Sequence, residues 1–302
     1  MKKLSKGKKI AIAVAVLLVI GIAAGGGSNE EKETNTDTKT EQSTTKDDAS
    51  KETTTSEAVT IENQEIFNKN GIVITTNGYE PSSLSDPEIK LIIENNSTQN
   101  VTIQTINSSV NGYMIDFQIS CEVAAGKKAN GTISISRSEL NASGVKAIAN
   151  IEFNFHIFDT DTWDAIVDSD VITLNTSISD THTQEYDSTG TVLFEDSTVK
   201  IISKKLVEDD YDTEAILYIE NNSSQYITVQ ARDTSINGFM VDPTISTDIA
   251  PGKKVVTDMS FSNTDLEENS ITSVDSIETS FHVFNTDSLD TIVDTPAITI
   301  TY

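Results

Sequence analysis

Two histidines occupy matching places in a repeated sequence and are the best candidates for chemistry in this chain. One lies in Phe-His-Ile-Phe at 155–158 and the other in Phe-His-Val-Phe at 281–284. Side chains alternate along a strand, so each histidine and the phenylalanine two residues on face away from the core. A surface histidine beside an aromatic ring can bind a ligand or respond to pH. The candidate ligand-binding residues are His156, Phe158, His282 and Phe284, and a structural or solvent-exposed role is the alternative.

Acidic residues crowd the loop after the first of these strands and suggest a metal. Carboxylate oxygens are ligands that calcium prefers, but the spacing departs from the EF-hand pattern, since Trp163 occupies the fifth loop position and no glycine follows it. The second repeat has Asn285 in place of Asp159. Asp159, Asp161 and Asp164 are therefore candidate calcium ligands, and capped turns with solvated charge are the alternative.

Nothing in the sequence predicts catalysis. It contains no nucleophile elbow, no cluster of zinc ligands and no glycine-rich nucleotide loop. We therefore expect no enzyme activity, no catalytic residues and no cofactor apart from the calcium considered above. Trp163 is replaced by Leu289 in the second repeat, which favours a hydrophobic plug over a platform for stacking a ligand.

The segments that must position these residues occur twice at a constant offset. Residues 89–104 return as 215–230, residues 110–116 as 236–242, residues 126–128 as 252–254, and residues 155–158 as 281–284. A period this long is that of a whole domain, and each copy has the size of an ordinary single domain. The chain therefore contains two tandem copies of one domain.

Alternating apolar and polar residues predict antiparallel strands in both copies. Leu91 and Ile93 face one way and Lys90 and Glu94 the other, and the second copy repeats the pattern. Turns are predicted at Asn-Gly (111–112 and 237–238) and Glu-Asn-Asn-Ser (94–97 and 220–223), and short helical turns at 138–140 and 264–266. The fold class expected is all-β, with two tandem antiparallel immunoglobulin-like sandwiches, and a small barrel is the alternative.

The N-terminus predicts export. Lysines precede an uncharged apolar run, so residues 10–27 would cross the membrane with the N-terminus in the cytoplasm and the rest outside. A cleaved signal peptide, which would make the protein secreted, is the alternative. The predicted organisation is a lysine-rich N-terminus and anchor (1–27), a disordered Thr/Glu/Lys linker (28–58), a first domain (59–176), a hinge (177–185) and a second domain (186–302).

Charge limits the partners. The formal net charge of −26 disfavours nucleic acid and anionic polymers. Cys121 is the single cysteine, so no internal disulfide forms, and its alternation with apolar neighbours predicts a small buried residue.

Several features of the chain occur together in one known family. They are the lysine-rich anchor, the Thr/Glu/Lys tether, Val-Asn-Gly-Tyr-Met (110–114), Pro-Gly-Lys-Lys (251–254) and Phe-His-Ile-Phe-Asp-Thr-Asp-Thr-Trp-Asp (155–164). In these features the chain resembles the extracytoplasmic immunoglobulin-like domains of uncharacterised Gram-positive membrane-anchored surface proteins. The resemblance implies a fold and a location, and no activity. We expect a non-enzymatic, membrane-tethered extracellular protein that binds an extracellular protein or envelope component or senses the envelope. A passive spacer and a hydrolase acting on the cell wall are the alternatives.

Overall fold

The computed structural model describes residues 59–302, which belong to one compact unit that spans Thr55–Tyr302. The predicted anchor (1–27) and linker (28–58) lie outside the described residues. Among residues 59–302, no helix is both long enough and apolar enough to cross a membrane.

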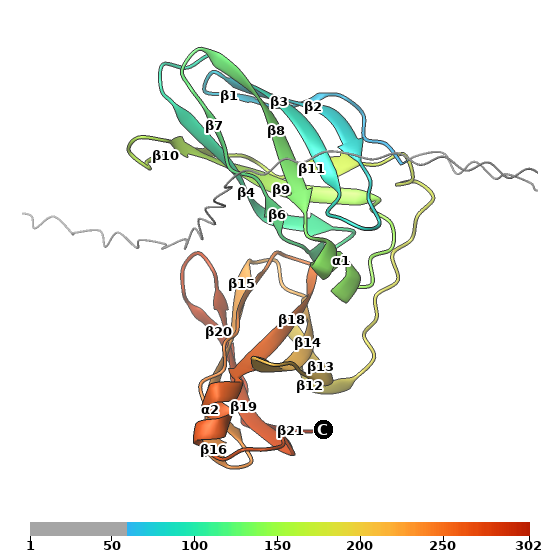
Figure 1. Cartoon of the computed structure of the whole chain (residues 1–302), viewed down its shortest axis with the longest axis vertical. Coiled ribbons are helices and arrows are strands. Elements are labelled where there is room, and N and C mark those ends of the chain that lie inside the picture. The colour runs from blue at the N-terminus through green and yellow to red at the C-terminus, as the bar shows by residue number, and fades with distance from the viewer. Residues whose placement is uncertain (1–58) are drawn as a thin grey trace, which may run out of the picture. The chain divides into compact units, whose positions relative to one another are not determined.

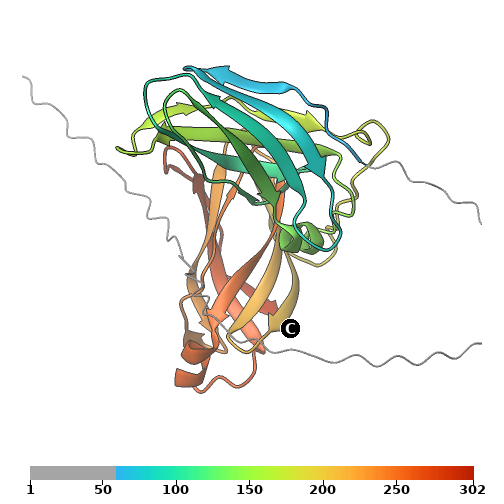
Figure 2. The same ribbon diagram turned by 45° about the horizontal axis from the view of Figure 1, so that its top comes forward.

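The first repeat is built from antiparallel strands in two layers, with β1, β2 and β3 in one and β9 and β11 in the other (Figures 1 and 2). One sheet has the order β1-β2-β3-β8-β6, and strands β4, β5, β7, β9, β10 and β11 belong to the other. The elements are β1 (Glu65–Lys69), β2 (Ile72–Glu80), β3 (Glu88–Asn95), β4 (Val101–Val110), β5 (Tyr113–Met114), β6 (Phe117–Gln118), β7 (Cys121–Val123), β8 (Lys127–Ile135), α1 (Arg137–Ala142), β9 (Asn150–Asp159), β10 (Ala165–Asp168) and β11 (Ile172–Asn175).

The second repeat has the same plan. Strands β12, β13, β14 and β18 form one layer, and β15, β16, β17, β19, β20 and β21 form a separate six-stranded sheet. The elements are β12 (Thr191–Glu195), β13 (Val199–Glu208), β14 (Asp212–Asn221), β15 (Ile227–Ile236), β16 (Phe239–Met240), β17 (Ser246–Ile249), β18 (Lys254–Ser262), α2 (Asn263–Glu268), β19 (Ser276–Asn285), β20 (Thr291–Asp294) and β21 (Ile298–Thr301). The all-β, antiparallel prediction is confirmed.

Each core lies between the apolar faces of two sheets. Ile89, Leu91 and Ile93 on β3 are buried, and they alternate with partly exposed Lys90 and Glu94. Strand β14 repeats this pattern, so the predicted inward faces are confirmed. Cys121 was expected to be buried but is only partly so, because it lies on the short strand β7 at one side of the first core. Burial raises the pKa of its thiol, which makes the thiolate scarce.

The predicted turns are present in both repeats. Asn111 and Gly112 have φ values of 50° and 86°, and Asn237 and Gly238 have 50° and 85°. Two successive left-handed residues form the tight turn that joins β4 to β5 and β15 to β16. The predicted helical turns are α1 and α2; α1 begins after Ser136, whose hydroxyl accepts a hydrogen bond from the Glu139 N–H.

A second Asn turn carries the chain from one sheet to the other. Asn95 ends β3, where its side-chain amide donates to the carbonyls of Gln99 and Val123, and its carboxamide oxygen accepts from the Ser97 N–H and hydroxyl. Asn221 makes the same four bonds in the second repeat. Both asparagines are buried, so each satisfies backbone groups that would otherwise lack partners.

The two repeats share one sheet. Strand β5 of the first repeat pairs in parallel with β18 of the second, with Tyr113 opposite Lys254, which joins strands of both repeats into a ten-stranded sheet. The Lys254 N–H donates to the Gly112 carbonyl at 3.0 Å. Tyr113 is buried with its ring centroid 6.3 Å from that of Tyr218. The hinge predicted at 177–185 stays a prediction.

Buried tyrosines predict a loss of stability at alkaline pH. Burial raises the pKa of Tyr79 and of Tyr113 to about 12. A tyrosine in the unfolded chain ionises near pH 10, so the folded state holds its proton more tightly. This contribution to stability is complete below about pH 10 and is lost as the pH rises towards about 12.

Thermal unfolding followed across this range, together with tyrosinate absorbance, checks the prediction. Tyr113→Phe should reduce the alkaline decrease in melting temperature, whereas Tyr211→Phe, at an exposed position, should not. A melting temperature that stays constant through this window would contradict it.

Candidate functional site

His156 on strand β9 and its counterpart His282 in the second repeat have equivalent partners. His156 lies opposite Asp168 on β10, and its Nδ1 atom is 2.6 Å from the carboxylate. Its ring centroid is 5.4 Å from that of Phe158 at 34° between planes. In the second repeat, His282 contacts Asp294 and lies 5.0 Å from Phe284 at 29°. A His-Asp pair packed on a phenylalanine is therefore a shared structural element of the repeat.

The four predicted ligand-binding residues differ in the solvent exposure of their side chains. His282 is only 7% exposed and Phe158 only 5%, so neither presents surface to a ligand. His156 and Phe284 are half-buried. The structure brings each histidine next to its phenylalanine, as the sequence pattern indicated, but it leaves little of either pair accessible.

A third ring distinguishes the first repeat. The indole of Trp163 stacks on Phe158 with centroids 5.4 Å apart and 17° between planes, and the His156 ring is tilted against Phe158. Trp163 covers Phe158 and is itself 76% exposed. Leu289, its counterpart, is 58% exposed. The prediction of a buried hydrophobic plug is wrong, because both side chains lie on the outer surface of the turn.

The turn that carries Trp163 is held by Asp159. One carboxylate oxygen of Asp159 accepts the N–H groups of Asp161 and Thr162, and the other accepts the Gln99 side-chain amide at 2.8 Å. The Trp163 N–H donates to the Asp159 carbonyl, and Trp163 has a φ of 64°. Bulky residues rarely adopt this left-handed backbone, so the turn imposes the conformation that lays the indole on Phe158.

These contacts explain the acidic loop as a capped turn. The backbone N–H of Thr162, followed by that of Asp161, lowers the pKa of the Asp159 carboxyl below its ordinary value. Asp161 accepts a hydrogen bond from Asn100 at 3.2 Å, and Asp164 is exposed. Within residues 59–302, no three His, Cys, Asp or Glu side chains are placed to hold a metal ion. The calcium hypothesis stays a prediction without a site.

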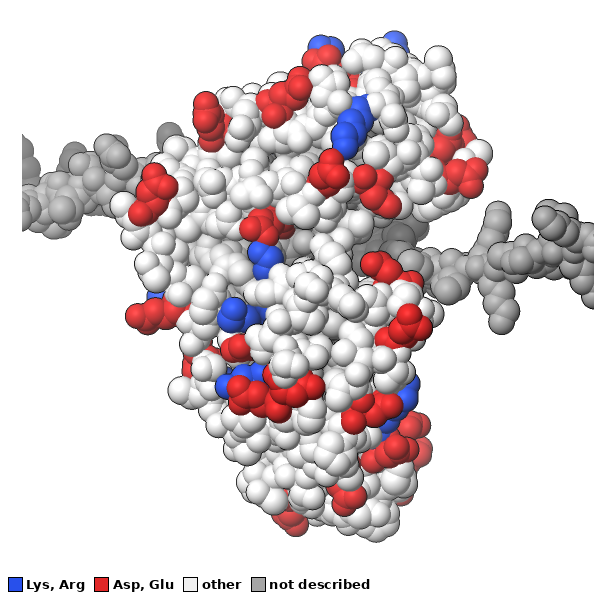
Figure 3. All heavy atoms as spheres, turned by 180° about the vertical axis from the view of Figure 1, so that it is seen from behind, with Lys and Arg blue, Asp and Glu red and all other residues white. Residues whose placement is uncertain are grey.

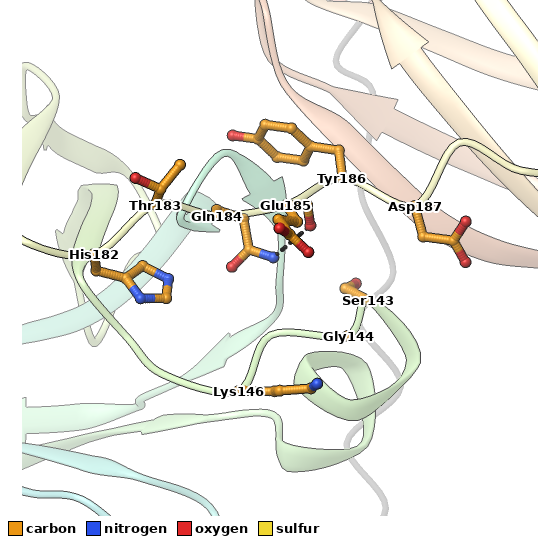
Figure 4. A pocket seen from close by; sticks show the side chains of 9 residues that line it. All are labelled: Ser143, Gly144, Lys146, His182, Thr183, Gln184, Glu185, Tyr186 and Asp187. Carbon is orange, nitrogen blue, oxygen red and sulfur yellow. Dashed lines mark hydrogen bonds between the residues drawn. The ribbon is translucent and has the colours of Figure 1, made fainter.

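A separate hollow of about 400 Å³ lies beside the turn after α1. Figure 4 shows that its lining comes from two segments, Ser143, Gly144 and Lys146 on one side and residues 182–187 on the other. The side-chain amide of Gln184 donates a hydrogen bond to the neighbouring Glu185 carbonyl, and the Tyr186 hydroxyl donates one to the Asn111 carbonyl. The charged groups do not converge on a point, so this hollow shows no arrangement for acid-base chemistry.

Electrostatics favour cations near the aromatic stack. Figure 3 shows Asp and Glu scattered over one face of the molecule, with Lys and Arg lying among them. The exposed carboxylates of Asp161 and Asp164 flank Trp163 in the chain. A positive group over the indole would therefore be attracted by the ring face and by the surrounding charge.

Comparisons with known proteins do not identify the chain. Neither a protein-family model nor a curated protein sequence matches it. Solved structures with some likeness include a protein of unknown function from Porphyromonas gingivalis W83, at 12% identity and a TM-score of 0.23, over 76% of this chain and 97% of that one. Another is red sea bream transglutaminase, at 14% identity and a TM-score of 0.22, over 78% of this chain and 31% of that one. Both TM-scores are too low to support an inference.

Proposed function

We propose that this is a non-enzymatic, membrane-tethered extracellular protein whose first domain binds a cationic group of an envelope component or extracellular protein through Trp163. The observation that carries the proposal is a tryptophan that is 76% exposed while stacked flat on Phe158. The second domain has Leu289 at this place, so the repeat itself does not require an indole. We propose that both domains are immunoglobulin-like sandwiches.

The stack prepares one face of the indole for a ligand. Phe158 covers the opposite face, and the left-handed turn limits the movement of Trp163. A ligand therefore meets a ring that is already ordered, which reduces the entropy lost on binding. A cation over a tryptophan gains about 0.5–1 kcal/mol at an exposed site, so a single ammonium group binds weakly and tight binding requires further contacts.

Location follows from the N-terminal sequence. The lysines and the apolar run at 10–27 support a single-pass anchor with the C-terminal domains outside, and a secreted form after signal cleavage is the alternative. The polar linker at 28–58 would hold the two domains away from the membrane.

Fluorescence tests the binding proposal directly, because Trp163 is the only tryptophan in the chain. We expect its emission to change progressively on titration with tetramethylammonium or arginine amide, with weak affinity, and not with the uncharged analogue neopentyl alcohol. Calorimetry with envelope extract should show that Trp163→Leu, which copies the second repeat, weakens binding by about two- to fivefold. Leu289→Ala is the matched control and should bind as the unchanged protein does. Emission that is insensitive to cations and to envelope extract would favour a passive spacer.

A further inference from the structure

The contact between the repeats joins two different surfaces. The first is the 113–114 edge, made of Tyr113 and Met114 on β5, and the second is the outer face of β13, β14 and β18 in the second repeat. Tyr113 shares a buried cluster with Ile202 and Tyr218, and Met114 packs against the second core. Such a contact is heterologous, because neither surface is matched to itself.

An ion pair accompanies these apolar contacts. Lys253, next to the residue that pairs with Tyr113, forms a salt bridge with Glu152 on β9 of the first repeat. Both side chains are half-buried. Lys254 adds a cation–π contact, with its Nζ atom 4.1 Å from the centre of the Tyr186 ring.

The second repeat has an edge equivalent to the 113–114 edge, and nothing within the described residues covers it. Phe239 and Met240 on β16 correspond to Tyr113 and Met114, follow the same Asn-Gly turn, and form the 239–240 edge. Phe239 is 50% exposed and Met240 is 67% exposed, although both residue types are usually buried. Glu278, the counterpart of Glu152, is also exposed.

The first repeat has an outer face, on β2, β3 and β8, that is equivalent to the outer face of β13, β14 and β18, and it is also uncovered. Strand pairing makes Ile92 the counterpart of Tyr218, and Ile92 is only half-buried. Lys127 is the counterpart of Lys253, and it is exposed. Neither Lys127 nor Glu278 takes part in a salt bridge within residues 59–302. The second repeat thus has an uncovered edge, and the first repeat has an uncovered outer face, of the kind that contact each other between the repeats.

We propose that a second copy of this chain docks there, with the 239–240 edge of one molecule against the outer face of β2, β3 and β8 of the next. The occupant follows from continuity with the contact already present between the repeats. Glu278 of one molecule and Lys127 of the next would reproduce the pair formed by Glu152 and Lys253. Because the contact is heterologous, repeated docking forms open rows, or rings where the rotation from copy to copy closes.

The intermolecular contact is weaker than the intramolecular one. Thr75 and Asn130 replace the apolar Ile202 and Val256, and the linker that supplies Tyr186 has no counterpart in it. Confinement of tethered copies to one membrane would raise their effective concentration and favour this weak contact. The proposal is separate from cation binding, since Trp163 lies in a different loop.

Sedimentation velocity of the full-length chain in density-matched detergent tests self-association. The average mass should rise with protein concentration. Met240→Asp buries a charge in the contact, and Glu278→Lys sets two lysines against each other, so each should lower the association constant by about tenfold or more. Adding Lys127→Glu to Glu278→Lys should restore association. Leu289→Asp, which charges an exposed leucine elsewhere in the second repeat, is the matched control and should associate normally.

Each alternative result overturns the proposal. The chain could stay monomeric at all concentrations, or association could survive both Met240→Asp and Glu278→Lys. The double variant Lys127→Glu with Glu278→Lys could fail to recover association, or the control Leu289→Asp could be as impaired as Met240→Asp. All substituted side chains are exposed, and unchanged melting temperatures would show that the variants fold. Unchanged Trp163 fluorescence titrations in Met240→Asp would show that docking and ligand binding fail separately.

Discussion

Replacing Ile93 by alanine is expected to lower the free energy of unfolding by about 2–5 kcal/mol. Ile93 is fully buried on β3, between Ile74 on β2 and Ala129 on β8, and its Cδ1 atom lies so close to Gly131 that a Cβ there would be 2.9 Å away. The truncation removes packed methyl groups and leaves a cavity that the rigid sheets do not fill. Ile219→Ala should have an effect of the same size in the second repeat, because Ile219 occupies the matching place on β14.

Urea titration monitored by circular dichroism measures both changes. Ile106→Ala is the matched control: Ile106 lies on β4, is partly exposed, and corresponds to Arg232 in the second repeat. Its loss should cost well under about 1 kcal/mol. Equal effects for Ile93→Ala and Ile106→Ala would show that the inward face has been assigned incorrectly.

Replacing Asn95 by alanine is expected to destabilise the first repeat by about 2–4 kcal/mol, since each buried group left without a partner costs about 1–3 kcal/mol. The amide of Asn95 is bonded to the Val123 carbonyl at 2.8 Å in a buried setting, and its oxygen organises the turn that leads from one sheet to the other. Asn221→Ala should reproduce the loss in the second repeat.

Replacing Asn95 by aspartate separates the contribution of its amide N–H donors from that of its oxygen acceptor. Asn95→Asp keeps the acceptor for Ser97 but loses both bonds to carbonyls and buries a charge, so it should be at least as destabilising as alanine. Ser97→Ala is the control, because Asn95 keeps its two carbonyl partners, and it should cost less. The role assigned to Asn95 would be wrong if Asn95→Asp unfolded at the same urea concentration as the unchanged protein.

Much of the architecture could be predicted from short stretches of sequence. The alternation at Ile89, Leu91 and Ile93 identifies a strand with one buried face, because side chains leave a strand on opposite sides. Asn111-Gly112 identifies its turn because few other dipeptides adopt two left-handed conformations in succession. The repeat strengthened both predictions, since the same features recur at 215–219 and 237–238.

The candidate site could be predicted only in part. The sequence placed His156 beside Phe158 correctly, because residues two apart share one side of a strand. It misjudged Trp163, since hydrophobicity alone predicts burial and the left-handed backbone that turns the indole outward is not visible in the residue types. The signal available was the contrast between the repeats, in which an indole replaces leucine while the neighbouring turn residues are largely kept.

The strands, their inward faces and the Asn-based turns can be read from the residues alone, because each depends on interactions within a few residues of the chain. Direct comparison of the two halves of the sequence reveals the repeat. Which surfaces stay open depends on the folded structure. Tyr113 and Phe239 are equivalent in sequence, yet one is buried between the repeats and the other is exposed. That difference depends on contacts between segments far apart in the chain, such as Tyr113 with Tyr218 and Glu152 with Lys253, which no local pattern encodes.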